Sequence, residues 1–192
     1  MSRPVIIGQL TDAKVVFIGP FGVGKTTALR CISDIPVVST EALSSEAAEL
    51  PAGSDKLTTT VAFDYGEWQF PDGPRVALFG MPGQDRFETL WRSHLAHSSA
   101  VVVWLYGDRD PELALCQRWL DILARCTAMA RMVVAVTRVP AEQADQVLAR
   151  YQELVGRYHP FAPVLLADPR LKGDVLQAVS MGLTSPIGPL TR

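Results

Sequence analysis

The chain has few cysteines, almost no excess of charge and no long apolar run, and each absence narrows its possible functions. Its three cysteines show no metal-ligand spacing and fall in predicted helices, which favours ordinary packing in a reducing compartment; they are Cys31, Cys116 and Cys126. The net charge is −2 and the basic residues are scattered, so nothing in the electrostatics favours nucleic acid as a ligand. Thiolate-metal proteins and nucleic-acid-binding proteins are therefore disfavoured classes.

Segments that would place the chain in or on a membrane are also missing. The longest apolar run, Ala100 to Tyr106, is too short to cross a bilayer, and the segment 1–10 lacks the apolar core of a signal peptide. The ends of the sequence carry neither a myristoylation pattern nor a prenylation box. We therefore expect a cytoplasmic protein with no direct membrane anchor.

What the sequence does contain is the alternation of an α/β domain. Its 192 residues are 48% apolar and 20% charged, which is enough for one substantial core. Apolar runs typical of strands alternate with stretches of helical spacing; the runs are Val15–Ile18, Val61–Tyr65, Val76–Phe79, Val101–Leu105, Met132–Val136 and Val164–Leu166. This order predicts a doubly wound, mostly parallel six-stranded sheet with helices on both faces. We expect one domain over 1–192, with a core of about 13–183 and an irregular tail at 184–192.

One edge strand of this sheet is expected to be antiparallel. The turn-forming run 71–74, Pro-Asp-Gly-Pro, separates Trp68–Phe70 from the strand that begins near Val76, which is typical of a hairpin. The helices are predicted at Lys25–Ser33, Phe87–Ala96, Glu112–Cys126, Glu142–Arg157 and Gly173–Gly182. The connection from Asp34 to Leu57 is long for a compact domain, and such connections are usually functional or mobile.

A phosphate-binding motif lies between the first predicted strand and the first predicted helix. Residues 19–26 read G-P-F-G-V-G-K-T and fit G-x-x-x-x-G-K-[ST]. A strand that feeds a glycine-rich turn into a helix N-terminus aims several backbone N–H groups at one point, where the helix dipole also favours negative charge. The predicted polyphosphate site consists of Gly22, Val23, Gly24, Lys25, Thr26 and Thr27. Within it, we expect Lys25 to reach the β- and γ-phosphates and the Thr26 hydroxyl to ligate Mg²⁺.

A second motif follows the strand predicted at Val76–Phe79. Residues 78–87 read L-F-G-M-P-G-Q-D-R-F and resemble the D-x-x-G-Q-E-R-F segment of Ras-like small GTPases. The resemblance is greatest to the bacterial MglA-like branch, which includes proteins encoded beside roadblock-domain partners in actinobacterial conservons and often carries F-G-T-P-G-Q-x-R-F. It implies that Gly83 gives an amide to the γ-phosphate and that Gln84 orients the attacking water. It also implies a guanine-nucleotide switch with GTP/GDP and Mg²⁺ as ligands, slow hydrolysis and a roadblock/LC7-type partner.

The segment from Thr58 to Tyr65 resembles the first switch of the same family, in which a threonine opens the edge strand as T-x-x-x-D-[FY]. Thr60 fits that pattern best, and Thr59 is the alternative. The resemblance implies that Thr60 closes over Mg²⁺ and the γ-phosphate, so that its position depends on the triphosphate.

Two positions near the phosphates depart from the family pattern. Gly80 stands where the family has the acidic residue that holds Mg²⁺ through water, so metal affinity is expected to be lower unless Asp64 reaches in to compensate. Phe21 stands in the phosphate loop where relatives carry a small residue. Its ring is expected to crowd the space shared by Gln84 and an assisting arginine, which would slow hydrolysis.

The positions that read the base depart further. The family's N-K-x-D is T-R-V-P here, and Pro140 has no side chain that accepts the two hydrogen bonds from guanine. The family's S-A-K is D-P-R, and its proline has no N–H for the guanine carbonyl. The residues expected around the base are Thr137, Arg138, Asp168, Pro169 and Arg170. We expect only a modest preference for guanine over adenine; a pseudo-GTPase scaffold stays open as an alternative, and the P-G-Q segment argues against a P-loop kinase.

Overall fold

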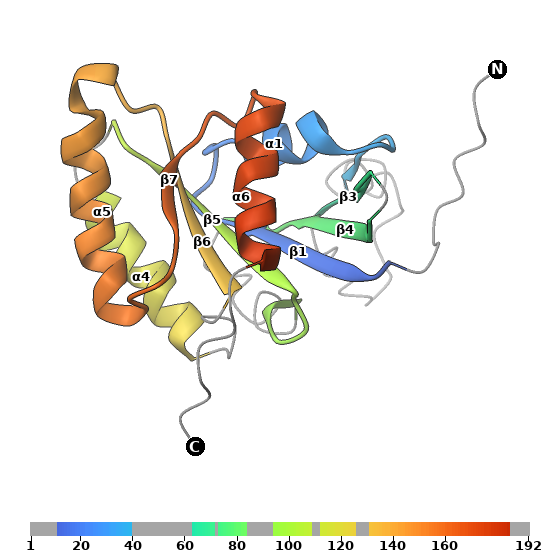
Figure 1. Cartoon of the computed structure of the whole chain (residues 1–192), viewed down its shortest axis with the longest axis horizontal. Coiled ribbons are helices and arrows are strands. Elements are labelled where there is room, and N and C mark those ends of the chain that lie inside the picture. Colours follow the sequence, from blue (N-terminus) through green and yellow to red (C-terminus); the bar gives the residue numbers. More distant parts are fainter. Residues whose placement is uncertain are drawn as a thin grey trace, which may run out of the picture.

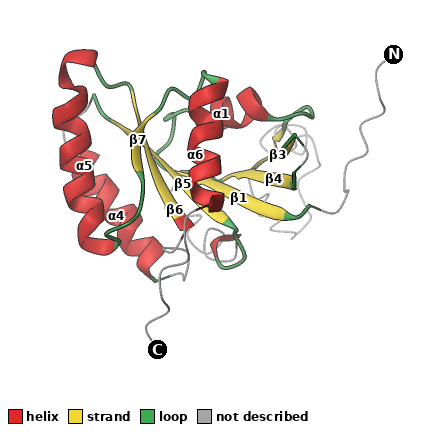
Figure 2. Ribbon diagram, viewed as in Figure 1, coloured by secondary structure: helices red, strands yellow, loops and turns green. Residues whose placement is uncertain are grey.

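The structure is a computed structural model that describes residues 11–39, 63–71, 73–83, 94–108, 112–125 and 131–184. Its described residues form a sheet of seven strands in the order β2-β3-β4-β1-β5-β6-β7 (Figures 1 and 2). The strands are β1 Ala13–Ile18, β2 Val38–Ser39, β3 Asp64–Gln69, β4 Arg75–Gly80, β5 Ala100–Tyr106, β6 Met132–Thr137 and β7 Val164–Leu166. The predicted fold class, a mostly parallel doubly wound sheet, is confirmed.

The predicted antiparallel hairpin is formed by β3 and β4, but β3 spans Asp64–Gln69 and not the predicted Val61–Tyr65. Its turn is closed by the N–H of Gly73, which donates to the carbonyl of Phe70, and by the N–H of Phe70, which donates to the carbonyl of Pro74. Outside β3 lies the two-residue strand β2, which was not predicted and pairs antiparallel with Asp64 and Tyr65. The strands β4, β1, β5, β6 and β7 are parallel, so their carboxyl ends share one edge of the sheet.

Helices cover both faces of the sheet, as predicted. They are α1 Lys25–Ile32, α4 Glu112–Ala124, α5 Ala144–Tyr158 and α6 Lys172–Thr184. Figure 1 shows α1 and α6 against one face and α4 and α5 against the other. Successive side chains of a strand point to opposite faces. Accordingly, Val15 and Phe17 of β1 pack in the core beneath α1 and α6, and Val16 and Ile18 pack beneath α4 and α5.

Where a predicted helix boundary differs from the observed one in α1, α4, α5 and α6, the difference is one or two residues. Ser33 caps α1 in an extended conformation, so the helix ends one residue early. The predicted start at Glu142 falls in a 3₁₀ turn, Ala141–Gln143, which follows Pro140 and precedes α5. Of the helix predicted at Phe87–Ala96, the described part is helical only at His94 and Leu95, and 84–93 lie outside the described residues.

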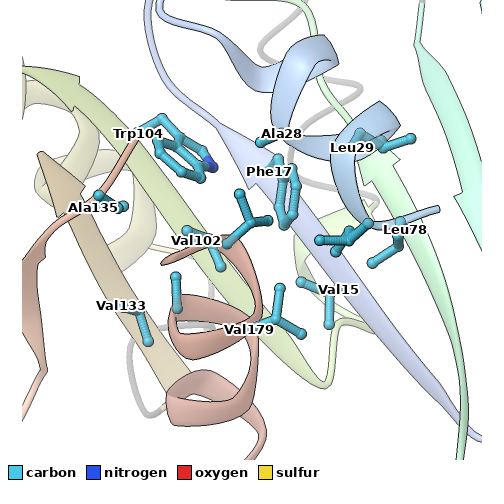
Figure 3. Packing of buried hydrophobic residues seen from close by; sticks show 14 of the residues in the cluster. Val15, Phe17, Ala28, Leu29, Leu78, Val102, Trp104, Val133, Ala135 and Val179 are labelled. Atoms are coloured by element: carbon cyan, nitrogen blue, oxygen red, sulfur yellow. The ribbon is translucent and has the colours of Figure 1, made fainter. Parts of the chain in front are cut away.

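The core beneath α1 and α6 reaches the loop that follows β1. There the rings of Phe17 and Trp104 meet edge to face with centroids 6.2 Å apart, in the same buried cluster as Ala28 of α1 and Val179 of α6 (Figure 3). Both rings are fully buried. The loop after β1 therefore begins next to buried aromatic side chains. No helix in the described ranges is long and apolar enough to span a membrane.

Candidate nucleotide-binding site

The loop between β1 and α1 depends on three glycines in conformations that other residues rarely adopt. Gly19, Gly22 and Gly24 have φ values of +136°, +77° and +113°. Space is restricted as well, because a Cβ at Gly19 would lie 2.1 Å from the carbonyl oxygen of Trp104. Successive turns of this kind form a concave row of backbone N–H groups that binds anions. The three glycines thus give residues 19–24 backbone conformations suited to such a row, at the place of the predicted phosphate loop.

Lys25 is the first residue of α1, and its buried side chain is hydrogen-bonded to the loop between β1 and α1. Its ammonium donates to the carbonyl of Gly19 at 2.9 Å and to that of Pro20 at 2.7 Å. Burial lowers the pKa of Lys25 and the negative charge of Asp64 offsets part of this effect, which leaves a pKa of about 8. An ammonium has three donors, so an anion in the loop can accept the third. The other first-turn residues differ in exposure: Thr26 is half-buried and Thr27 is exposed.

Asp64, the first residue of β3, reaches the phosphate loop. The hydroxyl of Thr26 donates to its Oδ2. Asp64 lies directly opposite Gly80 of β4, and a Cβ at Gly80 would lie 3.2 Å from the Cβ of Asp64 and 3.3 Å from its Oδ2. A carboxylate from β3 thus stands beside Thr26, and the glycine opposite it on β4 leaves room for it.

The hydroxyl of Thr26 and the carboxylate of Asp64 are hard oxygen donors of the kind that Mg²⁺ prefers. In the described part of the chain, no three or more His, Cys, Asp or Glu side chains gather into a metal centre. A magnesium ion that is bound together with phosphates needs only one or two protein ligands, so the pair fits that role.

The segment after β4 lies on the phosphate loop. The N–H of Met81 donates to the carbonyl of Phe17 at 2.9 Å, and a Cβ at Gly83 would lie 2.5 Å from the carbonyl oxygen of Gly19 and 2.6 Å from the backbone nitrogen of Phe21. Gly83 therefore lies against the phosphate loop, and its contact with a γ-phosphate stays a prediction. Gln84, Thr60 and the alternative Thr59 lie outside the described residues, so their roles stay predictions.

Two further loops from the same edge of the sheet reach the phosphate loop. Arg138, which follows β6, has a φ of +58°; its guanidinium lies 4.9 Å from the ring centroid of Tyr106 and donates to the carbonyl of Gly22 at 3.4 Å. Thr137 is buried at the end of β6. Pro169, which follows β7, packs on Gly24, where a Cβ would lie 2.6 Å from its Cγ. The structure thus brings the predicted base-reading loops together with the predicted phosphate loop.

The carboxylate of Asp168 is engaged by its neighbour. Arg170 donates to it from Nε at 2.9 Å, from Nη2 at 2.6 Å and from its backbone N–H at 2.9 Å. These hydrogen bonds lower the pKa of Asp168 below its usual value. A base could use this carboxylate only in competition with Arg170.

Sequence reasoning missed Tyr106. In the sequence it is only the last residue of the apolar run Ala100 to Tyr106, yet its hydroxyl donates to the carbonyl of Phe21 at 3.0 Å. The available signal was its place at the carboxyl end of a strand parallel to β1, because such ends line the same edge of the sheet. Phe21 itself is 74% exposed, although its backbone lies beneath Gly83.

No protein-family model and no curated protein sequence matches the chain. Among solved structures, the cytosolic domain of the T. maritima FeoB iron transporter in its GMPPNP form is similar, with a TM-score of 0.56 and 16% identity. The match covers 89% of this chain and 62% of that one, so the chain spans less than two thirds of the structure that it matches. At this identity, the similarity shows the fold. The chain therefore shares the α/β fold of that domain, and its G-x-x-x-x-G-K-[ST] motif lies between β1 and α1.

Proposed function

We propose that the chain is a guanine-nucleotide-binding molecular switch that hydrolyses GTP slowly, with GTP/GDP and Mg²⁺ as its ligands. One observation carries the proposal: the buried ammonium of Lys25 and the pair of Thr26 with Asp64 stand side by side at the start of α1. The ammonium can bind a phosphate, and the two oxygen donors beside it can bind a metal ion. This combination suits a polyphosphate that carries a bound metal ion. The similar fold of a protein solved in its GMPPNP form, a guanine-nucleotide analogue, supports the choice of nucleotide.

The position of Gly83 suggests how the protein would change conformation between its two nucleotide states. Its backbone is packed against Gly19 and Phe21, at the part of the loop next to which a third phosphate would be bound. The third phosphate of a triphosphate would occupy space there and accept a hydrogen bond from the Gly83 N–H. A diphosphate has no phosphate at that position, so it would leave the space empty and the N–H without this acceptor. The two nucleotides would then favour different positions of the segment after β4, and a partner that contacts this segment would distinguish them.

The partner that we propose is a roadblock/LC7-type protein, and support for it comes from the motif at 78–87. A second candidate function is a pseudo-GTPase scaffold, which acts through its surface, holds nucleotide weakly, and has relaxed base specificity and weak or absent hydrolysis. The specific observation that favours the scaffold is at the base, where Pro169 rests on Gly24 and Asp168 is engaged by Arg170. The base specificity of binding separates the two candidates.

We expect GDP to compete better than ADP, but by less than about a thousandfold, in Mg²⁺-containing buffer. Two hydrogen bonds from guanine to a carboxylate, at about 1.5–3 kcal/mol each, are lost with Pro140. Competition against a fluorescent GDP analogue measures the ratio, and mass spectrometry identifies any nucleotide that co-purifies. A larger preference for GDP would mean that another residue reads guanine. If neither nucleotide binds, the switch is excluded and the scaffold replaces it.

We expect intrinsic GTP hydrolysis to be very slow and to accelerate in Phe21→Gly, because the exposed ring belongs to the phosphate loop, where the family resemblance implies that Gln84 and an assisting group act. Gln84→Leu is expected to slow it further. In small GTPases an assisting arginine contributes about 10³–10⁵ in rate. Single-turnover hydrolysis is the measurement. Phe161→Gly is the matched control, because this ring is 79% exposed in the loop before β7, away from the phosphate loop. Equal rates for Phe21→Gly and Phe161→Gly would exclude crowding by Phe21.

A further inference from the structure

We propose that Tyr106 and Arg138 form a clamp on the outer side of the phosphate loop and that Tyr106 is a positioning residue for phosphate binding. This inference rests on the proposed function, because it concerns how the same loop is made ready for its ligand. The clamp consists of the Tyr106 hydroxyl on the carbonyl of Phe21 and the Arg138 guanidinium on the carbonyl of Gly22.

The clamp is fixed to the sheet. Tyr106 ends β5 and is almost fully buried, and its neighbour in the parallel ladder is Thr137, the residue before Arg138. The hydroxyl of Tyr151, on α5, donates to the carbonyl of Tyr106 at 2.7 Å in the interior. The Arg138 guanidinium lies over the Tyr106 ring, where the negative face of the ring attracts a cation. Both donors are therefore held in place before any ligand arrives.

These two contacts also fix the direction of the backbone N–H groups that follow each carbonyl, because the peptide bond is planar. In a trans peptide, the carbonyl of one residue and the N–H of the next point to opposite sides. The bond from Tyr106 to the Phe21 carbonyl therefore directs the N–H of Gly22 away from Tyr106. In the same way, the bond from Arg138 to the Gly22 carbonyl directs the N–H of Val23 away from Arg138. Both N–H groups belong to the predicted polyphosphate site.

A clamp matters here because the loop has little intrinsic stiffness. Glycine populates both signs of φ almost equally, so a loop with glycines at 19, 22 and 24 has several competing conformations. A side chain at Gly22 would also meet the Tyr106 hydroxyl, since a Cβ there would lie 3.2 Å from it. The hydroxyl thus fills the position behind the loop, and it restricts the tip to the conformation that presents its amides to a ligand.

The test removes one hydroxyl and keeps the ring. Tyr106→Phe is expected to weaken binding of inorganic pyrophosphate and of GDP by the same factor, about threefold to tenfold, which corresponds to the loss of one neutral hydrogen bond. The factors should be equal because the clamp acts on the loop and not on the base. Tyr158→Phe is the control, since it removes a tyrosine hydroxyl that donates to Asp121 at the surface between α5 and α4.

A second readout distinguishes positioning from general stability. In the free protein, Tyr106→Phe is expected to speed hydrogen exchange at the amides of Gly22 and Val23, measured by NMR, while amides in the centre of β6 keep the rates of the Tyr158→Phe control. If Tyr106→Phe fails to fold, Arg138→Met replaces it, because the Arg138 guanidinium is at the surface, and the Val23 amide is then the readout.

The outcomes separate the two proposals. Unchanged exchange at Gly22 and Val23, or pyrophosphate binding equal to that of Tyr158→Phe, overturns the clamp and leaves the proposed function standing. If the parent protein binds neither pyrophosphate nor GDP, the proposed function fails. The exchange rates in the free protein still decide whether the clamp orders the loop.

Discussion

Replacing Lys25 by alanine is expected to weaken GDP binding at least about a hundredfold. The substitution removes a buried cation whose ammonium is already held against the loop by the carbonyls of Gly19 and Pro20. Hydrogen bonds between a charged donor and a phosphate contribute about 1.5–3 kcal/mol each, and a lysine in this position makes more than one. Two bonds at the lower limit correspond to a factor of about a hundred or more in the dissociation constant. Isothermal titration calorimetry measures it.

The control is Lys172→Ala, which removes an exposed cation from the first turn of α6. Because Lys25 also supports two loop carbonyls, thermal unfolding of each variant must be followed alongside binding. Lys25→Met keeps an apolar side chain of similar length, and it replaces the alanine variant in the binding experiment if that variant unfolds. Equal affinity of the Lys25 and Lys172 variants for GDP would remove the phosphate-site assignment altogether.

The parts of the fold that were predictable are those set by local patterns. Buried parallel strands read as continuous apolar runs, and Met132–Val136 therefore predicts β6 to within one residue. The strand β2 has only two residues and no such run, so its existence depends on Asp64 and Tyr65 of a distant segment. The start of α5 was predicted two residues early for a related reason. The 3₁₀ turn after Pro140 continues directly into the helix, and no local pattern marks the residue at which the turn ends and the helix begins.

The candidate site likewise has parts that local sequence patterns predict and parts that they do not. The phosphate loop is contiguous in sequence, so its glycines, Lys25 and Thr26 could be assigned from the motif alone. The contact of Thr26 with Asp64 joins residues 38 positions apart, and the sequence offered it only as a possible compensation for Gly80. The bond from Tyr106 to Phe21 joins residues 85 positions apart. No local pattern distinguishes such a tyrosine from a core residue, because its role depends on which strand ends beside the loop.

The second large effect is expected at Asp64, and it concerns the metal. In the parent protein Mg²⁺ should strengthen GDP binding, and in Asp64→Asn this gain should fall about tenfold or more, since a hydrogen bond to a charged group contributes about 1.5–3 kcal/mol. The ratio of dissociation constants without and with Mg²⁺ is the proper measure. Asp64 also favours the charged form of Lys25, so its loss would weaken binding even without metal. Asp121→Asn, at a surface carboxylate of α4, is the control.

An exchange of positions tests the same point more sharply. Because Asp64 and Gly80 face each other across the hairpin, the double variant Asp64→Gly with Gly80→Asp returns the carboxylate to β4 and frees the space on β3. We expect it to recover most of the magnesium effect that Asp64→Asn loses. Gly80→Asp alone is expected to unfold at lower temperature than the parent, because it places a second carboxylate in contact with the first. If the magnesium effect in Asp64→Asn equals that in Asp121→Asn, Asp64 has no part in metal binding, and its bond to Thr26 serves the loop alone.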